Sequence, residues 1–278
     1  MIELPEAITV ARQMQETLVG KRIAVGNRGN SPHKFVFVNR PDEEYAAILP
    51  GLTITGAWAH GSSIIVDLDP GYRLVFGDGG ERLCYHPDAT TLPKKCQLLL
   101  QFEDGSYFTL TVSGWGSAKL LDNSEHELER HFGRPRISPT SDDFTLEYFN
   151  SLFAELRPES SCSAKYFIVS DPGILGVANG MLQDILFHAR IHPRRAVVTL
   201  SSAERTALYH AIRDVISQAV AQQGRHDERD LFNQPGQYHR ILDASTVNLP
   251  CVNCGTLIQK EQFLGGAIYF CPECQVRD

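Results

Sequence analysis

Four cysteines near the C-terminal end of the sequence have the spacing of a metal site. Cys251, Cys254, Cys271 and Cys274 form the pattern C-x2-C-x16-C-x2-C. Two such pairs can present four thiolates tetrahedrally to one zinc ion, which leaves no ligand position for water. We therefore predict one structural Zn²⁺ ion that takes no part in catalysis. Two disulfides are the alternative, and a chain without an export signal disfavours them.

The segment between the two cysteine pairs is expected to form a β-hairpin. Its two strand-like runs are 256–258 and 267–270, and Gly265-Gly266 lies close before the second run. Gly255 follows the second cysteine and suits the tight turn that a zinc knuckle needs. The hairpin would bring the two cysteine pairs together as a zinc-finger unit, residues 248–278.

The first half of the chain has the pattern of antiparallel β-structure with a flanking helix. A helix is predicted for residues 3–19, because apolar residues recur there at helical spacing and Gly20 follows. From about residue 22 to 121, short apolar runs alternate with turn sequences such as Asp69-Pro70-Gly71. Four of the expected strands are 63–68, 72–76, 97–102 and 107–112. This pattern predicts an antiparallel β-sandwich as domain 1–121.

The second half has a helical pattern. Residues 122–145 are polar, contain several prolines and glycines, and are the expected linker. Helices are predicted for 144–156, 174–188 and 201–222, the last after the capping box Ser201–Glu204. These helices form the expected domain 146–247. The predicted fold class is α+β with two domains, of which the second carries the zinc hairpin.

The composition is that of a globular protein outside membranes. About 42% of the residues are apolar and 21% are charged, and no run approaches 18 apolar residues. The first residues are acidic and lack the apolar region of a signal peptide, so we expect a cytoplasmic protein. The other cysteines stand alone and are expected to pack as small apolar residues: Cys84, Cys96 and Cys162.

The charge distribution bears on nucleic acid binding. The net charge of −7 argues against a nucleic acid partner, because phosphates are bound by positive potential. From Arg190 to Arg213, however, five arginines face one carboxylate, Glu204. Arg194 and Arg195 within this basic zone are candidate DNA-binding residues. A solvated helix face is the alternative interpretation.

Several segments occur in an order that resembles a known family. Glu3-Leu4-Pro5-Glu6 opens a helix, a β-sandwich follows, and Gly176–Asn179 and Ile191–Pro193 lie in the helical half before the four cysteines. Together they resemble the formamidopyrimidine-DNA glycosylase and endonuclease VIII (Fpg/Nei) family of base-excision repair proteins. The resemblance covers almost the full length. It implies a helix–two-turn–helix domain in the second half and a zinc-finger hairpin at its end.

The resemblance implies roles for individual residues. Asn179 and Lys165 match family residues that hold DNA phosphates. Glu3 matches the catalytic acid, which protonates the sugar ring oxygen, and Glu6 matches a second acidic residue of the opening segment. Each residue also has a purely structural alternative. Asn179 could cap a helix, and Glu3 could lie in a first turn where the helix dipole favours carboxylates. The implied partner is double-stranded DNA, damaged or abasic, bound by a monomer associated with a bacterial nucleoid.

The sequence departs from the family pattern at positions that carry the family's catalytic and DNA-binding residues. The family's nucleophile is an N-terminal proline, and here Ile2 stands in its place. The amine of Ile2, or of a retained Met1, would have to attack the sugar instead. Ser62 and Gly266 stand where the family has a phosphate-binding lysine and a zinc-finger arginine. Trp115 either stacks in place of the residues that fill the gap left by a flipped base, or lies in the core.

Three functions follow from this pattern. The first is a DNA glycosylase and AP lyase that uses an N-terminal amine, with activity weakened by the substitutions. The second is a DNA-lesion or branched-DNA binding protein without strand chemistry. The third is a repurposed scaffold that binds another ligand, for which Ser31–Lys34, Asp78 and His86 offer polar groups.

Overall fold

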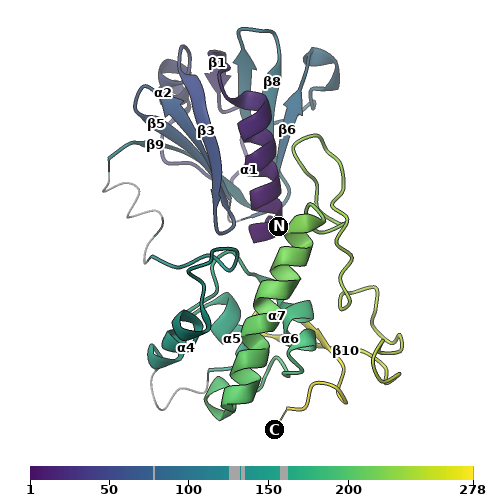
Figure 1. The fold of residues 1–278 in the computed structure, drawn as a ribbon. Helices are drawn as coiled ribbons and strands as arrows, with labels where there is room; N and C mark the ends of the chain where they lie inside the picture. Colours follow the sequence, from purple (N-terminus) through teal and green to yellow (C-terminus); the bar gives the residue numbers. More distant parts are fainter. Residues whose placement is uncertain (78, 125–131, 133–134, 157–161, 278) are drawn as a thin grey trace. The chain divides into compact units, whose positions relative to one another are not determined.

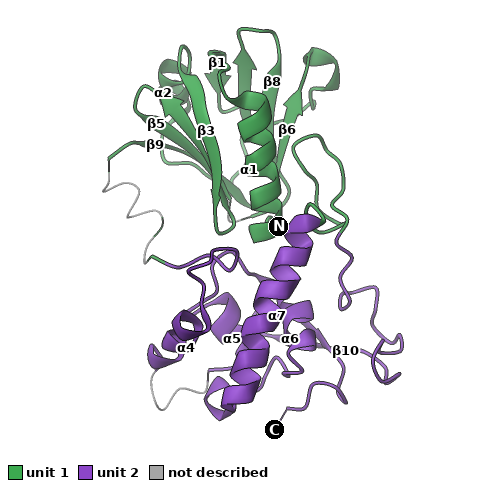
Figure 2. Ribbon diagram, viewed as in Figure 1, with its two compact units in different colours: residues 1–135, 222–237 green, residues 136–221, 238–278 purple. Residues whose placement is uncertain are grey.

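The chain divides into two compact units, which Figure 2 colours separately. The computed structural model describes residues 1–278 except 78, 125–131, 133–134, 157–161 and 278. Unit 1 comprises residues 1–135 and 222–237, and unit 2 comprises residues 136–221 and 238–278. The segment 222–237, which the sequence analysis assigned to domain 146–247, therefore groups with the N-terminal half. The reason is packing, since Leu231 lies in the core of unit 1.

Unit 1 is a β-sandwich with a long helix beside it (Figure 1). One sheet has the strand order β1-β7-β8-β6 and the other β2-β9-β5-β4-β3. All strand pairs are antiparallel except the two-residue pair of β2 with β9. The elements are α1 (Leu4–Leu18), β1 (Ile23–Asn27), β2 (Val36–Phe37), α2 (Asp42–Ile48), β3 (Thr53–His60), β4 (Ser63–Asp69), β5 (Tyr72–Gly77), β6 (Glu81–His86), η1 (Ala89–Thr91), β7 (Leu98–Phe102), β8 (Tyr107–Val112) and β9 (Gly116–Asp122).

The core of unit 1 joins both sheets and the first helix. Helix α1 packs against β3 and β4, and its Met14 is fully buried. Phe76 from one sheet and Phe108 from the other meet in the same cluster, with ring centroids 5.5 Å apart. Because side chains alternate along a strand, every second residue of β7 points into this core. The first turn of α1 is thereby fixed against a rigid sheet.

Unit 2 combines helices with the C-terminal hairpin. Helix α6 packs against α7 and β11. The buried carboxylate of Asp184 in α6 accepts hydrogen bonds from the Tyr238 hydroxyl and the backbone N–H groups of Ile241 and Leu242, which fastens the chain leading to the hairpin. The elements are α4 (Leu146–Ala154), α5 (Ala164–Val169), α6 (Asn179–His188), η2 (Val197–Thr199), α7 (Ser202–Ala221), β10 (Gln259–Phe263) and β11 (Gly266–Phe270).

Two predicted elements differ from the structure. The helix expected at 174–188 begins only at Asn179, because the residues before it form turns around Gly173 and Gly176, both with positive φ. Ile174 and Val177 are buried, but from this turn segment. The first hairpin strand is Gln259–Phe263 rather than 256–258, since β10 is mostly exposed and polar and shows no apolar run.

No helix in the described part of the chain is both long and apolar enough to cross a membrane.

Candidate active site and metal cluster

The four C-terminal cysteines converge as their spacing predicts. Their sulfur atoms all lie within 4.8 Å of one another, with Cys254 and Cys271 at 3.4 Å. The backbone N–H groups of Asn253 and Cys274 donate to the sulfur atoms of Cys251 and Cys271, both at 3.4 Å. Four sulfur donors at this separation could hold one metal ion, which is consistent with the expected zinc finger.

Glu3 and Glu6 lie at the start of α1, and both carboxylates are buried. Glu3 occupies the N-cap position, and its backbone N–H donates to Glu6 Oε2 at 2.9 Å. Pro5 suits the first turn because its missing N–H would have no helical partner there. The exposed fractions of Glu3 and Glu6 are only 1% and 3%. Two carboxylates this deeply buried need a compensating charge.

Arg225 supplies that charge from the segment after α7. Its Nη1 donates to Glu3 Oε1 at 3.1 Å, its Nη2 to Glu6 Oε2 at 2.8 Å, and its Nε to Glu6 Oε1 at 3.1 Å. The backbone N–H of Arg225 also donates to Glu6 Oε1 at 2.8 Å. Burial alone would lower the pKa of Arg225, but Glu3 and Glu6 raise it above its ordinary value. Gly224 has φ +91°, and a Cβ there would lie 3.0 Å from Glu6.

The N-terminus belongs to the same cluster. The α-amine of Met1 donates to Glu228 Oε1 at 2.5 Å, and the Met1 carbonyl accepts from Arg225 Nη2. Ile2 is buried, and its peptide N–H donates to Gly79 O at 3.2 Å. The structure therefore brings Glu3 and Glu6 together with an amine, which in this structure is on Met1 rather than on Ile2.

Lys165 and Asn179 meet at the turn of the C-terminal hairpin. Helices α5 and α6 are joined by two turns over residues 170–178, which place Lys165 and Asn179 near each other. Lys165 Nζ donates to Phe263 O at 2.8 Å, and Asn179 Nδ2 donates to Ala267 O at 3.0 Å. A Cβ on Gly266 would lie 3.3 Å from Lys165 Nζ and 3.7 Å from Asn179 Nδ2. Burial lowers the pKa of Lys165.

Arg194 and Arg195 have carboxylate partners within unit 2. Arg194 Nε lies 2.7 Å from Glu261 Oε2, and its guanidinium stacks on the Phe263 ring at 4.1 Å. Arg195 Nη1 lies 2.7 Å from Glu204 Oε1. Both side chains thus stabilise the hairpin and the start of α7, and much of their charge is compensated.

The remaining residues named in the sequence analysis lie outside the clusters described above, or outside the described part of the chain. Ser62 lies in the two-residue turn between β3 and β4. The core alternative for Trp115 is wrong, since the side chain is 46% exposed. Cys84 is only half-buried and lines a cavity together with His86. Asp78 lies outside the described residues.

Sequence reasoning missed Arg225, Glu228 and Gln183. The first two lie in the charged run 225–230, which looks like an ordinary exposed loop. Gln183 Oε1 accepts from Tyr269 N at 3.1 Å, while its Nε2 donates to Ala267 O at 3.3 Å, so it ties α6 to the hairpin. Only the spacing of Gln183 from Asn179, four residues along one helix, hints at a shared partner.

Two family models match the chain. The "Formamidopyrimidine-DNA glycosylase N-terminal domain" matches residues 1–112. The "Formamidopyrimidine-DNA glycosylase H2TH domain" matches residues 137–229. The sandwich, the two helices joined by two turns, and the four-cysteine hairpin together define a DNA glycosylase fold of the helix–two-turn–helix class. The chain belongs to the Fpg/Nei family, as its sequence predicted.

Individual relatives and solved structures agree over the full length. The formamidopyrimidine-DNA glycosylase of Streptococcus pneumoniae serotype 4 is 28% identical over 287 residues, which span 100% of both chains. That of Chloroflexus aggregans is 29% identical over 283 residues, 99% of each chain. Lactococcus lactis Fpg in complex with abasic-site DNA superimposes with a TM-score of 0.85 at 23% identity, covering 98% of this chain and 99% of that one. At that identity the structural likeness shows the fold.

The cysteine cluster predicts a metal dependence. We expect one zinc ion per chain by atomic absorption, and a Cys254→Ser variant should lose the metal and lower the melting temperature of unit 2. Structural zinc sites contribute about 10–16 kcal/mol of apparent binding free energy at neutral pH. A Cys96→Ala variant, which removes a buried thiol elsewhere, should keep its zinc. A metal-free protein with all four of these thiols oxidised would show that the disulfide interpretation is right.

The Arg225 cluster predicts a large loss of stability on truncation. Arg225→Met leaves two buried carboxylates without their cation, which costs about 3–5 kcal/mol of unfolding free energy. The matched control Arg229→Met changes an arginine of the same segment whose side chain, within the described residues, donates to two backbone carbonyls, so it should cost much less. Urea denaturation of the full chain measures the unfolding free energy of each variant. Equal losses in the two variants would contradict the central position of Arg225.

Proposed function

We propose that this protein is a DNA glycosylase with AP-lyase activity, acting on damaged or abasic double-stranded DNA in base excision repair. The observation that carries the proposal is the N-terminal cluster of unit 1. It holds an α-amine, on Met1, within one hydrogen-bonded network with the buried carboxylates of Glu3 and Glu6. An amine nucleophile beside carboxylates is the set of groups that imine chemistry at a sugar carbon requires.

The residues of the cluster divide the steps among them. Glu228 is placed to take the proton that the Met1 amine must lose before it attacks C1′ of the sugar. At an abasic site the C1′–N bond forms, and the aldehyde oxygen leaves as water to give an imine. A carboxylate of the cluster then removes a proton from C2′, a C2′–C3′ double bond forms, and the C3′–O bond breaks to release the 3′ phosphate and cut the strand. If Met1 is removed in the cell, the amine of Ile2 takes this role.

Arg225 sets a condition on the role of Glu3. While Arg225 Nη1 donates to Glu3, the carboxylate is held in its charged form. Glu3 can protonate the sugar ring oxygen only after it has taken up a proton, which requires that this ion pair loosens. We therefore expect Glu3 to act as an acid only in a rearranged complex with DNA.

We propose that Lys165 and Asn179 hold DNA phosphate at the hairpin turn. An ammonium group has three N–H donors, and the described structure engages one of them, at Phe263 O. Asn179 lies at the N-terminus of α6, where backbone N–H groups add favourable field for an anion. The DNA in similar Lactococcus lactis Fpg structures carries an abasic site or Fapy-dG, which are suitable test lesions.

A second function, lesion binding without chemistry, is favoured by two observations. Arg225 already satisfies both carboxylates, and Ile2 replaces the family's proline. A protein of this kind would keep the phosphate contacts and form no covalent intermediate. In either case we propose a monomer that works at the bacterial nucleoid.

Borohydride trapping on duplex DNA with an abasic site separates the two functions. We expect a reduced adduct whose peptide map places the DNA on Met1, or on Ile2 if intact mass shows that Met1 is absent. Acetylation of the N-terminus should abolish trapping, and Glu3→Gln should reduce it at least tenfold. Tight binding with no adduct would favour the non-catalytic function. Absence of both binding and adduct at about 50 mM salt would contradict the whole proposal.

The phosphate contacts predict a selective loss of DNA affinity. Lys165→Met should weaken binding roughly 10-fold to 100-fold and lower the salt dependence by about one counterion, because it removes a charged contact. Asn179→Ala should weaken binding less and leave the salt dependence nearly unchanged. Lys95→Met, which removes an exposed lysine of unit 1, is the charge-matched control. Fluorescence anisotropy across a salt series measures all three, and equal effects of Lys165→Met and Lys95→Met would contradict the assignment.

A further inference from the structure

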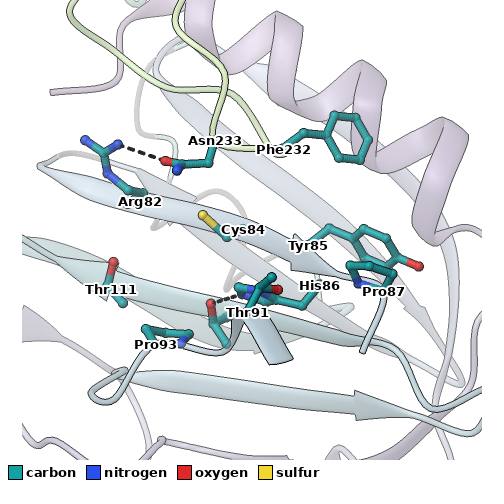
Figure 3. A pocket seen from close by; sticks show the side chains of 11 residues that line it. Arg82, Cys84, Tyr85, His86, Pro87, Thr91, Pro93, Thr111, Phe232 and Asn233 are labelled. Carbon is teal, nitrogen blue, oxygen red and sulfur yellow. Dashed lines mark hydrogen bonds between the residues drawn. The ribbon is translucent and has the colours of Figure 1, made fainter. Parts of the chain in front are cut away.

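A cavity of about 570 Å³ lies in unit 1, and none of the residues of the proposed active site lines it (Figure 3). Its floor is the face of β6 and β8 opposite the sandwich core. Cys84 pairs with Thr109, and Arg82 with Thr111, across these two strands. The alternate residue Leu83 points into the core, so the floor residues point away from it. The sheet therefore forms the floor of the cavity, and segments outside the strands form the rest of its lining.

Hydrogen bonds of His86 hold in place the part of the cavity wall that helix η1 contributes through Thr91. His86 Nδ1 lies 2.9 Å from the Thr91 hydroxyl, and His86 Nε2 lies 2.9 Å from the Thr109 hydroxyl. These bonds fasten the short helix η1 to the sheet. Burial lowers the pKa of His86, so its ring is neutral at pH 7 and can donate at one nitrogen and accept at the other. A pocket fixed in this way is formed before any ligand arrives.

Aromatic side chains close a second part of the wall. The segment 231–233 runs along the edge strand β6, where Tyr85 N donates to Leu231 O at 2.9 Å. Tyr85 and Phe232 then meet edge to face, with ring centroids 6.3 Å apart. Figure 3 shows these two rings and Pro87 at one end of the cavity, and Arg82 with Asn233 at the other. One end of the cavity is therefore aromatic and the other is polar.

The polar end carries the positive charge of the exposed Arg82 side chain, and the carboxylate that acts on the neighbouring Cys84 is Asp230, outside the lining. Arg82 is the one cation among the lining residues, and none of them is an aspartate or glutamate. In the described chain, the hydrogen bond of Arg82 is a long one, 3.4 Å from Nη1 to Asn233 Oδ1. Burial raises the pKa of Cys84, so its thiol stays protonated and adds no negative charge. A guanidinium in this setting suits an oxyanion, which it binds through paired hydrogen bonds.

We infer that this cavity binds a small organic anion made of a flat ring and one carboxylate or phosphate group. The oxyanion would lie against Arg82 and the Thr111 hydroxyl, and the ring beside Tyr85 and Phe232. The volume falls within the usual range of small-molecule sites, about 300–1,000 Å³. This site is independent of the proposed DNA chemistry.

Three naphthalene probes test the inference by calorimetry. 1-Naphthoate and 1-naphthyl phosphate carry the two candidate head groups, and 1-naphthalenemethanol is the neutral match. We expect at least one anion to bind 10-fold or more tightly than the alcohol, because a hydrogen bond to a charged group is lost in the alcohol. The tighter of the two anions identifies the head group. Equal binding of all three probes, or no binding at 1 mM of any, would overturn the inference.

Two variants and an alkylation experiment test whether the anion binds in this cavity. Arg82→Gln should remove the preference for the anion, whereas Arg22→Gln, an exposed arginine elsewhere in unit 1, should keep it. The bound anion should also slow alkylation of Cys84 by N-ethylmaleimide, read by peptide mapping. An anion preference that survives Arg82→Gln, or undiminished alkylation of Cys84 at saturating anion, would place the binding elsewhere and overturn the inference. Because no DNA is present, failure here leaves the glycosylase proposal untouched.

Discussion

The burial of Arg225 between two carboxylates is the interaction on which the N-terminal half depends. A guanidinium and two carboxylates out of water are each costly, and they are tolerated because both carboxylates accept hydrogen bonds from the guanidinium. This network fixes the first turn of α1, the Met1 carbonyl and the segment 222–237 in one arrangement. Glu228 extends it to the α-amine. The position of the proposed chemistry is thus a result of electrostatic compensation as much as of the helix that carries Glu3.

The same network shows what Met1 and Ile2 contact at the end of the chain where the family has a proline. A proline nucleophile needs its methionine removed, whereas here Met1 has its own partners: Glu228 for the amine and Arg225 for the carbonyl. Ile2 contributes its side chain to the core and its N–H to Gly79. The residue that interrupts the family pattern in the sequence is therefore a packing residue in the structure. Function at this end of the chain depends on which atom bears the free amine.

Features that rest on local pattern could be predicted from the sequence, and features that rest on distant partners could not. The cysteine spacing and the apolar alternation of the sandwich strands reflect neighbours in the chain or in the adjacent strand, so they are visible in the sequence. Arg225 is more than 200 residues from the carboxylates that bury it, and a charged run after Gly224 looks like a solvated loop. Strand β10 is missed for a related reason, since its exposed polar residues form no apolar pattern and its pairing with β11 follows the backbone register.

The cluster at Met1 also has a practical consequence for producing the protein. A fusion partner or affinity tag joined to the first residue would turn its amine into an amide and remove the charge that Glu228 binds. The carboxylates would stay buried with one cation fewer, and the amine of the proposed imine chemistry would be gone. Recombinant material meant for enzymology should carry its tag at the opposite end of the polypeptide, or none at all.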